Sequence, residues 1–358
     1  MIRAFTPTEL LAVISDGLDD GALFAVESSP AIVVALDEPF DRDDLGRVAR
    51  VLAPAPVVLI GLSSHGPFDE ALTKDLDLLL CSGDNVASPW VGCGTGLAET
   101  VQAICASVVD SPDASVALAQ LLRVGAASSA TDAVIAESWV YSLLQGGSRY
   151  AQWLDSRSSR TTRPRPESPV VRLERVGDVL YVTLDRPDVH NAFGTRMRDE
   201  LVEAFRLADI DRTICSVVVR GEGPSFCSGG DLDEFGIAPS PVDAHSVRTT
   251  RNAGISLVAI AERVEVLVHG TCVGAGVELP AFAARVVAHS ATTFRLPEIS
   301  MGLVPGAGGT SSIPRRIGRH RAAYLALSGR PIDAQLALEW GLVDQIDDSR
   351  FDLEGQHL

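Results

Sequence analysis

The amino-acid sequence predicts an α/β fold arranged in two parts. Short apolar runs typical of buried strands alternate with segments of helical periodicity along the chain. Residues 155–169 break this alternation, because they are rich in Ser, Thr, Arg and Pro and contain no large apolar residue that could anchor them. We therefore expect an exposed linker at residues 156–169 between an amino-terminal region, residues 1–155, and a carboxy-terminal region, residues 170–358.

The composition indicates a soluble globular protein that avoids polyanions. The chain has 358 residues, of which 46% are hydrophobic, and a formal net charge of −17. A negative field of this size repels nucleic acids and anionic membrane surfaces. No apolar run is long enough to span a bilayer, and the amino terminus lacks the charged and apolar regions of a secretory signal. We expect a cytoplasmic protein.

The cysteines and histidines indicate neither disulfides nor a metal site. No C-x-x-C pair is present, and the seven histidines show no metal-ligand spacing. Most of the cysteines stand in apolar strings, so we expect reduced core residues at all six positions: Cys81, Cys93, Cys105, Cys215, Cys227 and Cys272.

The carboxy-terminal region alternates strands and helices. Residues 170–173 and 179–184 are expected to form paired strands, followed by a helix over residues 195–208 whose apolar residues share one face. Further along we expect a strand at 215–220, a helix at 244–262, a strand at 264–270, a helix opening at 277–284 and a strand at 285–289.

The amino-terminal region echoes this pattern. Residues 30–39 match residues 178–187 in pattern, and each stretch is followed by an amphipathic helix and an apolar strand. A degenerate internal repeat explains the match, and so does a chance similarity between two α/β units; both interpretations stay open. Residues 95–109, 115–123 and 130–147 are helical by periodicity.

Two Gly-rich segments follow predicted strands directly. In residues 223–235, Gly229 and Gly230 let a ligand approach the main chain, and Asp231 can cap the next segment. In residues 269–284, a helix starts near Gly274–Gly276, so its first N–H groups suit a developing negative oxygen, and Glu278 stands on the first turn. Taken alone, these features are most often a plain loop and a glutamate that favours the helix dipole.

A third segment, residues 294–310, places Glu298 after a proline and before an apolar run and a Gly-rich loop. Carboxyl groups in apolar surroundings have raised pKa values and can act as general acids. A single Pro-Glu pair in a loop is normally a solvated surface feature. The three segments gain weight only in combination.

In this order and spacing, the three segments resemble the crotonase (enoyl-CoA hydratase/isomerase) superfamily. Residues 186–193, RPDVHNAF, resemble the family's opening motif, and residues 326–346 resemble its closing motif. The resemblance covers nearly all of the carboxy-terminal region. It implies a spiral of repeated β-β-α units and a lyase of fatty acid metabolism that hydrates a 2-enoyl-CoA thioester. It also implies that no metal and no cofactor are needed, since coenzyme A is part of the substrate.

The resemblance also assigns site residues. It places an oxyanion hole at the backbone N–H groups of Gly230 and Ala275, the two catalytic carboxyl groups at Glu278 and Glu298, and a water-holding N–H at Gly306. The acyl pocket is expected along residues 232–251. The residues expected to bind coenzyme A are Arg186, Asn191, Ala192, Phe193, Ser228, Asp231 and Leu232.

The chain departs from the family pattern at three places. Ala275 stands where glycine is common, and Asp188 stands where a lysine often helps to hold the CoA phosphates. The family continues beyond residue 346 with helices that cover the site and build a trimer or hexamer, whereas residues 130–154 resemble those helices. We hypothesise that the amino-terminal region is a degenerate crotonase copy whose helices replace that cover, and we expect a homo-oligomer.

Two other functions stay open. A 3-enoyl-CoA to 2-enoyl-CoA isomerase needs one base and the same oxyanion hole, although two glutamates favour hydration. A non-catalytic acyl-CoA-binding subunit would also fit the departures from the pattern.

Overall fold

The carboxy-terminal region is built on a six-stranded sheet. The structure, a computed structural model, describes residues 3–20, 30–37, 40–52, 55–65, 73–84, 86–157, 168–238 and 240–351. In the sheet order β14-β11-β9-β8-β7-β6, all neighbours are parallel except β7 and β6. The strands are β6 (Val171–Val176), β7 (Val179–Leu184), β8 (Ser216–Gly221), β9 (Val264–Val268), β11 (Arg285–Ala288) and β14 (Gln345–Ile346).

In the described part of this region, a smaller sheet and seven α-helices accompany the six-stranded sheet. The small sheet has the order β10-β12-β13, with β10 (Thr271–Val273), β12 (Thr293–Arg295) and β13 (Ile332–Asp333). The helices are α8 (Thr195–Ile210), α9 (Pro241–Thr250), α10 (Ala253–Val258), α11 (Ala275–Glu278), α12 (Gly309–Ile317), α13 (Arg319–Ser328) and α14 (Ala334–Trp340). The predicted strand, strand and helix series of an α/β fold is confirmed.

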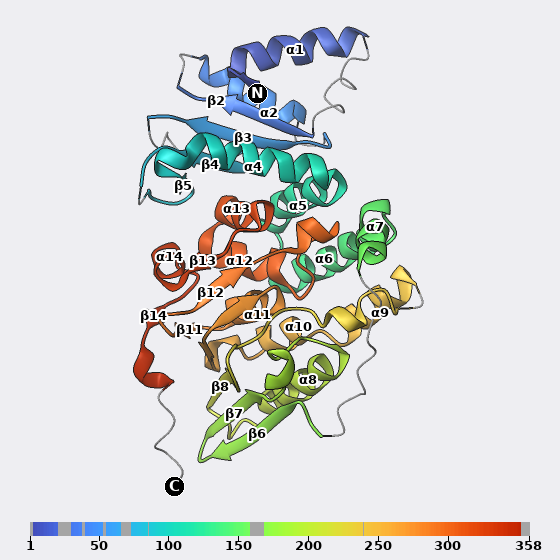
Figure 1. The fold of residues 1–358 in the computed structure, drawn as a ribbon, viewed down its shortest axis with the longest axis vertical. Coiled ribbons are helices and arrows are strands. Elements are labelled where there is room, and N and C mark those ends of the chain that lie inside the picture. The colour runs from blue at the N-terminus through green and yellow to red at the C-terminus, as the bar shows by residue number, and fades with distance from the viewer. Residues whose placement is uncertain are drawn as a thin grey trace.

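The amino-terminal region is a second α/β unit with a parallel sheet in the order β1-β2-β3-β4-β5 (Figure 1). On β2, Ile32 and Val34 join one core, while Ala31 and Val33 face the other, as the two-residue period of a strand requires. The strands are β1 (Ala4–Phe5), β2 (Ala31–Ala35), β3 (Val58–Ser63), β4 (Leu78–Cys81) and β5 (Val91–Gly92).

Helices α1 (Pro7–Asp20) and α2 (Arg42–Leu52) supply apolar residues to the first of these cores. Helices α4 (Leu97–Asp110) and α5 (Pro112–Gly125) lie between the sheet and the carboxy-terminal region (Figure 1) and belong to the second core, which continues into that region. The helices expected from periodicity are confirmed.

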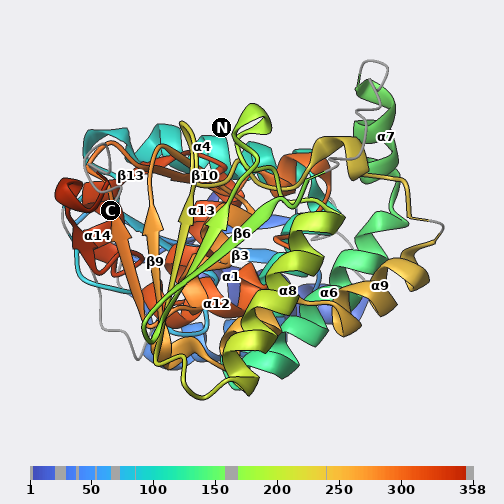
Figure 2. The same ribbon diagram turned by 90° about the horizontal axis from the view of Figure 1, so that it is seen from below.

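Helices α6 (Ala130–Gln145) and α7 (Ser148–Ser156) lie against the carboxy-terminal region. Helix α6 contacts α12 and runs beside α9 (Figures 1 and 2). Most of the expected linker, residues 158–167, lies outside the described residues, but Arg157 donates a hydrogen bond to the carbonyl of Leu232. That residues 1–155 are a degenerate crotonase copy stays a prediction.

The structure corrects three local predictions. The helix expected at 244–262 is divided into α9 and α10, because the side chain of Asn252 accepts the N–H of Ile255 and starts a new helix. The helix expected at 277–284 is the single turn α11, since Pro280 follows it and has no N–H to continue the ladder. Cys215 is exposed, because it precedes strand β8 instead of lying within it.

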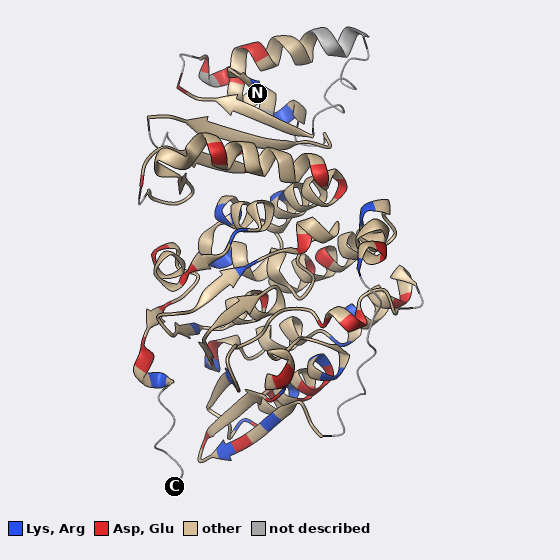
Figure 3. Cartoon of the chain, viewed as in Figure 1, with Lys and Arg blue, Asp and Glu red and all other residues tan. Residues whose placement is uncertain are grey.

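Strand β6 is an edge of the six-stranded sheet and carries alternating charge (Figure 3). Arg172, Glu174 and Arg175 are exposed there, which disfavours pairing with another sheet edge. Among the helices that the structure describes, none combines the length and apolar character needed to cross a bilayer.

Candidate active site

The residues predicted from three separate segments lie around one cavity of about 430 Å³. Gly230 comes from the loop after β8, Ala275 and Glu278 from the turn after β10, and Glu298 and Gly306 from the loops after β12. Each segment follows a strand, so the sheets bring the three turns to the same place.

Gly230 and Ala275 line this cavity, and their backbone N–H groups have no acceptor among the residues that the structure describes. Neither Gly230 nor Ala275 donates its amide to another residue that the structure describes. The neighbouring groups are fixed, since the Gly229 carbonyl accepts the Phe193 N–H at 2.7 Å and the Gly274 N–H donates to the carbonyl of Arg295 at 3.0 Å. Preorganised N–H groups of this kind can hold a negative oxygen.

Glu278 is a buried carboxyl group held by a loop of backbone amides. Glu278 is only 2% exposed, and its Oε2 accepts the N–H groups of Ala307 at 2.7 Å and Gly309 at 2.8 Å. Burial raises the pKa of Glu278 to about 7, against the opposing effect of the backbone hydrogen bonds. The group can therefore lose or take a proton near neutral pH.

Glu298 is half-buried, and its carboxyl group has fewer partners. Its Oε2 is inaccessible to solvent and has no hydrogen-bond partner among the described residues. Burial, followed by the nearby charge of Glu278, raises the pKa of Glu298 well above its ordinary value. In this surrounding the protonated form is favoured, so Glu298 is suited to donate a proton.

Gly274 shows that the two carboxyl groups converge. A Cβ atom added to Gly274 would lie 2.6 Å from Oε1 of Glu298 and 3.8 Å from Oε1 of Glu278. Both carboxyl groups therefore reach the same point beside the start of α11. Glycine is required there, since its φ of +50° is also unfavourable for other residues.

A third buried carboxyl group, Glu137 of helix α6, was not found by sequence reasoning. Its Oε1 accepts the N–H of Gly308 at 2.7 Å, and its Oε2 accepts the N–H and hydroxyl of Thr310 at 2.8 and 2.7 Å. Burial, followed by the charge of Glu278, raises the pKa of Glu137 to about 8. One signal was available, because Glu137 lies three residues after Val134 and therefore on the buried face of α6.

Glu137 and Glu278 together satisfy four consecutive amides at the start of α12. Ala307 and Gly309 donate to Glu278, while Gly308 and Thr310 donate to Glu137. Free N–H groups at a helix start favour negative charge, so both carboxylates are well placed electrostatically. An element of the amino-terminal region thus fixes the loop that orients Glu278.

Tyr141 lies one turn after Glu137 and covers Gly306. A Cβ atom at Gly306 would lie 2.4 Å from the Tyr141 ring, so only glycine allows this approach. Both residues line the cavity. Helix α6 therefore contributes to the wall of the site as well as to the support of its loop.

Comparison with known proteins identifies the carboxy-terminal region. The sequence profile of the enoyl-CoA hydratase/isomerase family matches residues 174–358, about half of the chain. The chain belongs to this family. The predicted crotonase resemblance is thus confirmed, and the amino-terminal α/β region is additional to the matched part.

Several members of the enoyl-CoA hydratase/isomerase family are similar in sequence. The 2,3-dehydroadipyl-CoA hydratase of Escherichia coli is 36% identical over 176 residues, which cover 49% of this chain and 68% of that protein. The 1,2-epoxyphenylacetyl-CoA isomerase of the same organism is 34% identical over 48% of this chain and 66% of its own length. A solved putative enoyl-CoA hydratase from Thermobifida fusca in complex with CoA is 28% identical, covers 51% of this chain and 74% of that chain, and has a TM-score of 0.47.

The residues expected to bind coenzyme A in this family member lie close together, and two of them, Phe193 and Asp231, line the cavity. Arg186 forms a buried ion pair with Asp231 at 2.7 Å. The Asn191 side chain is fully buried, accepts the N–H of Arg186 and donates to the carbonyls of Glu222 and Ser225, so it holds the loop.

The remaining three of these residues do not line the cavity. Ala192 is buried, Ser228 donates its hydroxyl to the carbonyl of Val189, and the Leu232 side chain is exposed. That the whole set contacts coenzyme A stays a prediction.

The three raised carboxyl pKa values predict that folding stability falls as the pH rises. The unfolded chain releases these protons near the ordinary glutamate pKa of 4.5, whereas folded Glu278, Glu298 and Glu137 retain theirs to higher pH. In that window the unfolded state binds fewer protons, so the free energy of unfolding decreases with increasing pH. Urea unfolding at about pH 5.5 and about pH 8.5 measures the change.

The Glu298→Gln variant isolates the contribution of one group. Glutamine carries no proton to lose, so the variant is expected to lose less stability than the wild type between the two pH values. Glu174→Gln, at an exposed position on β6, serves as the matched control and should keep the wild-type pH dependence. Equal pH dependence in wild type and Glu298→Gln would contradict the expectation.

Proposed function

We propose that this protein is an enoyl-CoA hydratase that adds water across the double bond of a 2-enoyl-CoA thioester. The observation that carries the proposal is the convergence of Glu278 and Glu298 beside Gly274, in the same cavity as the N–H groups of Gly230 and Ala275. Hydration needs both a proton acceptor and a proton donor. Two carboxyl groups with different surroundings supply them.

The two N–H groups act on the thioester. Its carbonyl oxygen lies between Gly230 and Ala275, whose amides hold the negative charge as the enolate forms. Each oxyanion donor contributes on the order of a hundredfold or more to the rate. Because the donors are backbone groups, their position depends on the turns after β8 and β10 and not on particular side chains.

The two carboxyl groups divide the proton transfers. Glu278 accepts two N–H bonds that favour its ionised form, so it takes the proton of the attacking water while the water oxygen bonds to Cβ. The Oε2 of Glu298 has no such bond among the described residues, so this group keeps its proton, which it delivers to Cα as the enolate collapses. The Gly306 N–H supports the water. Proton return from Glu278 to Glu298 through solvent completes the cycle.

Loss of the conjugated thioester absorbance of crotonyl-CoA tests hydration directly. We expect the full-length protein to remove this absorbance with formation of 3-hydroxybutyryl-CoA, as identified by mass. Absence of water addition together with conversion of a 3-enoyl-CoA to its 2-enoyl isomer would favour the isomerase. Binding of an acyl-CoA without turnover would favour a non-catalytic subunit.

The wider setting follows from the same proposal. An acyl-CoA thioester is the substrate, and the chemistry proceeds through carboxyl groups and backbone amides of the protein itself. A trimer or hexamer, and a cytoplasmic location, are proposed from the family resemblance alone.

A further inference from the structure

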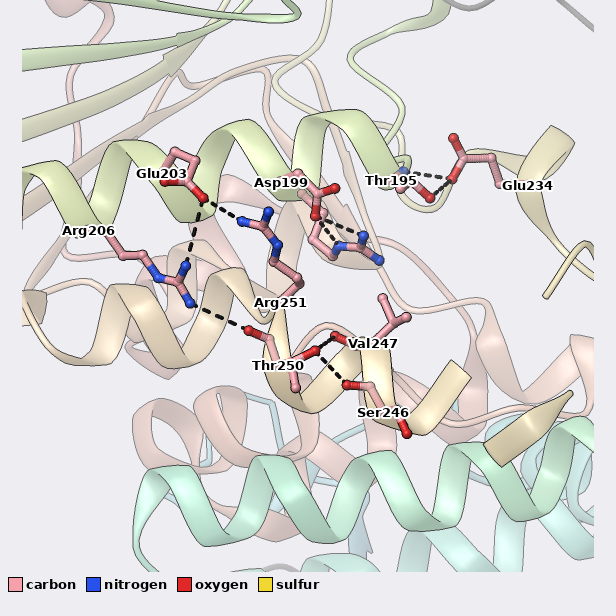
Figure 4. Close-up of polar contacts among 10 residues, drawn as sticks. Thr195, Asp199, Glu203, Arg206, Glu234, Ser246, Val247, Thr250 and Arg251 are labelled. Atoms are coloured by element: carbon pink, nitrogen blue, oxygen red, sulfur yellow. Dashed lines mark hydrogen bonds and ion pairs between the residues drawn. The ribbon is translucent and has the colours of Figure 1, made fainter. Parts of the chain in front are cut away.

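Three arginines among the described residues line the cavity, and two of them have carboxylate partners. Arg198 lies 2.8 Å from Asp199, and Arg251 is paired with Glu203 on helix α8 (Figure 4). Figure 4 also shows Arg206 beside the same Glu203. The charges of Arg198 and Arg251 are therefore balanced within the protein.

Among the described residues, the hydrogen-bond partners of the third arginine, Arg248 of helix α9, are all neutral. Its Nε donates to the Ser138 hydroxyl at 3.2 Å, its Nη1 to the Gln145 side-chain carbonyl at 3.2 Å, and its Nη2 to the Ser142 hydroxyl and, at 3.5 Å, to the Ser138 carbonyl. Its guanidinium carbon lies 4.6 Å from the centre of the Tyr141 ring. No carboxylate within the described part of the chain lies within 4.0 Å of it.

Arg248 retains one N–H group that can donate to a ligand. A guanidinium has five N–H donors, and the four contacts leave one on Nη1. Taking a cation out of water is costly unless an anion or hydrogen bonds compensate; here the hydrogen bonds come from neutral groups, and the charge of Glu137 acts on Arg248 without a direct ion pair among the described residues. A ligand carboxylate in the cavity would provide the missing negative charge and a geometry that arginine matches well.

Arg248 lies in the segment that is expected to form the acyl pocket. The Tyr141 ring contacts Gly306 and also stacks with Arg248, so one aromatic ring separates this cation from the water-holding amide. Helix α9 belongs to the segment 232–251, which was expected to form the acyl pocket.

The other cavity carboxylates on this side have partners of their own. Glu234 accepts the N–H and hydroxyl of Thr195 (Figure 4), and Asp243 accepts the hydroxyl of Ser240. Asp231 is paired with Arg186. An anionic group at the end of an acyl chain would thus meet Arg248 as its counter-charge.

We propose that Arg248 binds a carboxylate at the far end of the acyl chain, so that the substrate is a CoA thioester of a dicarboxylic acid. This inference rests on the proposed function, because it takes the cavity to be the acyl-CoA site. It predicts selectivity for an acyl chain that carries a terminal negative charge over the matched neutral chain.

Binding of saturated acyl-CoA pairs tests the inference without requiring turnover. Calorimetry on the full-length protein compares butanoyl-CoA with succinyl-CoA, hexanoyl-CoA with adipoyl-CoA, and octanoyl-CoA with suberoyl-CoA. At the chain length that reaches Arg248, we expect the dicarboxylic thioester to bind about tenfold or more tightly than its neutral partner, as one charge-assisted hydrogen-bonded pair provides. Equal or weaker binding of the dicarboxylic member at all three lengths would overturn the proposal.

Variants of Arg248 distinguish recognition of the ligand carboxylate from a purely structural role. Arg248→Met should abolish the preference, and Arg248→Lys should retain part of it because the positive charge remains. Arg251→Met is the matched control, since Arg251 lines the same cavity but is already paired with Glu203, and the preference should persist. If Arg248→Met weakened both members of a pair equally, Arg248 would be only a link between α9 and α6, and the proposal would fail.

The two proposals fail in different ways. A charge preference in binding, without hydration of the corresponding 2-enoyl thioesters, would reject the hydratase and leave the recognition by Arg248 standing. Hydration of neutral 2-enoyl-CoA thioesters, without any preference in binding, would reject Arg248 alone.

Discussion

Replacing Glu298 with glutamine is expected to reduce kcat for hydration by about 10²–10⁴-fold. The substitution keeps the volume of the side chain but removes the proton that we assign to Cα. The buried Oε2 of Glu298 has no hydrogen-bond partner among the described residues, so exchanging that oxygen for an amide NH₂ breaks no bond at this atom. Steady-state kinetics with crotonyl-CoA should show the loss in kcat, with a much smaller change in KM.

Two comparisons make the Glu298 experiment decisive. Glu278→Gln should lose at least as much activity, because an amide cannot take the proton of the attacking water, while its single oxygen can still accept the N–H groups of Ala307 and Gly309 that share Oε2 in the wild type. Glu174→Gln, on the exposed edge strand β6, should retain wild-type kinetics. Hydration by Glu298→Gln at the wild-type rate would exclude the proposed division of roles.

Replacing Glu137 should impair activity, although Glu137 lies outside residues 174–358, the segment that matches the family. Glu137→Ala leaves the N–H groups of Gly308 and Thr310 and the Thr310 hydroxyl without their acceptor, at a cost on the order of 1–3 kcal/mol for each buried donor left unpaired. The loop also positions Glu278, so we expect kcat to fall roughly 10- to 100-fold. Urea unfolding and crotonyl-CoA kinetics measure the two effects.

The pH profile distinguishes a positioning role of Glu137 from simple destabilisation. The charge of Glu137 contributes to the raised pKa of Glu298, so its removal should lower that pKa. Glu298 must be protonated to act as the donor, and the high-pH limb of kcat should therefore move to lower pH in Glu137→Gln. Glu99→Gln, an exposed position on α4, is the control. An unshifted limb combined with unchanged kcat would refute the role.

The carboxy-terminal elements could be predicted because their signals are local, whereas the five cavity residues were assigned from the order and spacing of motifs that resemble the crotonase family. A strand that ends in Gly-rich residues defines its turn, and Glu278 and Glu298 stand at fixed distances from such turns. The division between α9 and α10 was missed, since the pattern of apolar residues continues through Asn252 and only its capping bond breaks the helix.

The role of Glu137 could not be read from the sequence for a different reason. Helical periodicity shows that Glu137 faces inward, but it does not show which loop, more than 170 residues later in the chain, will meet it. The same holds for Arg248, whose lack of a carboxylate partner among the described residues depends on how α6 and α9 are packed. Contacts between distant segments require coordinates.

Consecutive amides at the start of α12 bind alternately to Glu278 and Glu137, and this arrangement limits how the two regions can be recombined. Exchanging the first 155 residues for an unrelated domain would remove one of the two anions that meet the first turn of α12, even with every catalytic position retained. A chimera that kept its acid-base behaviour would need a new acidic side chain at the same spot. Diversification of the two halves of this gene is therefore expected to be mutually constrained.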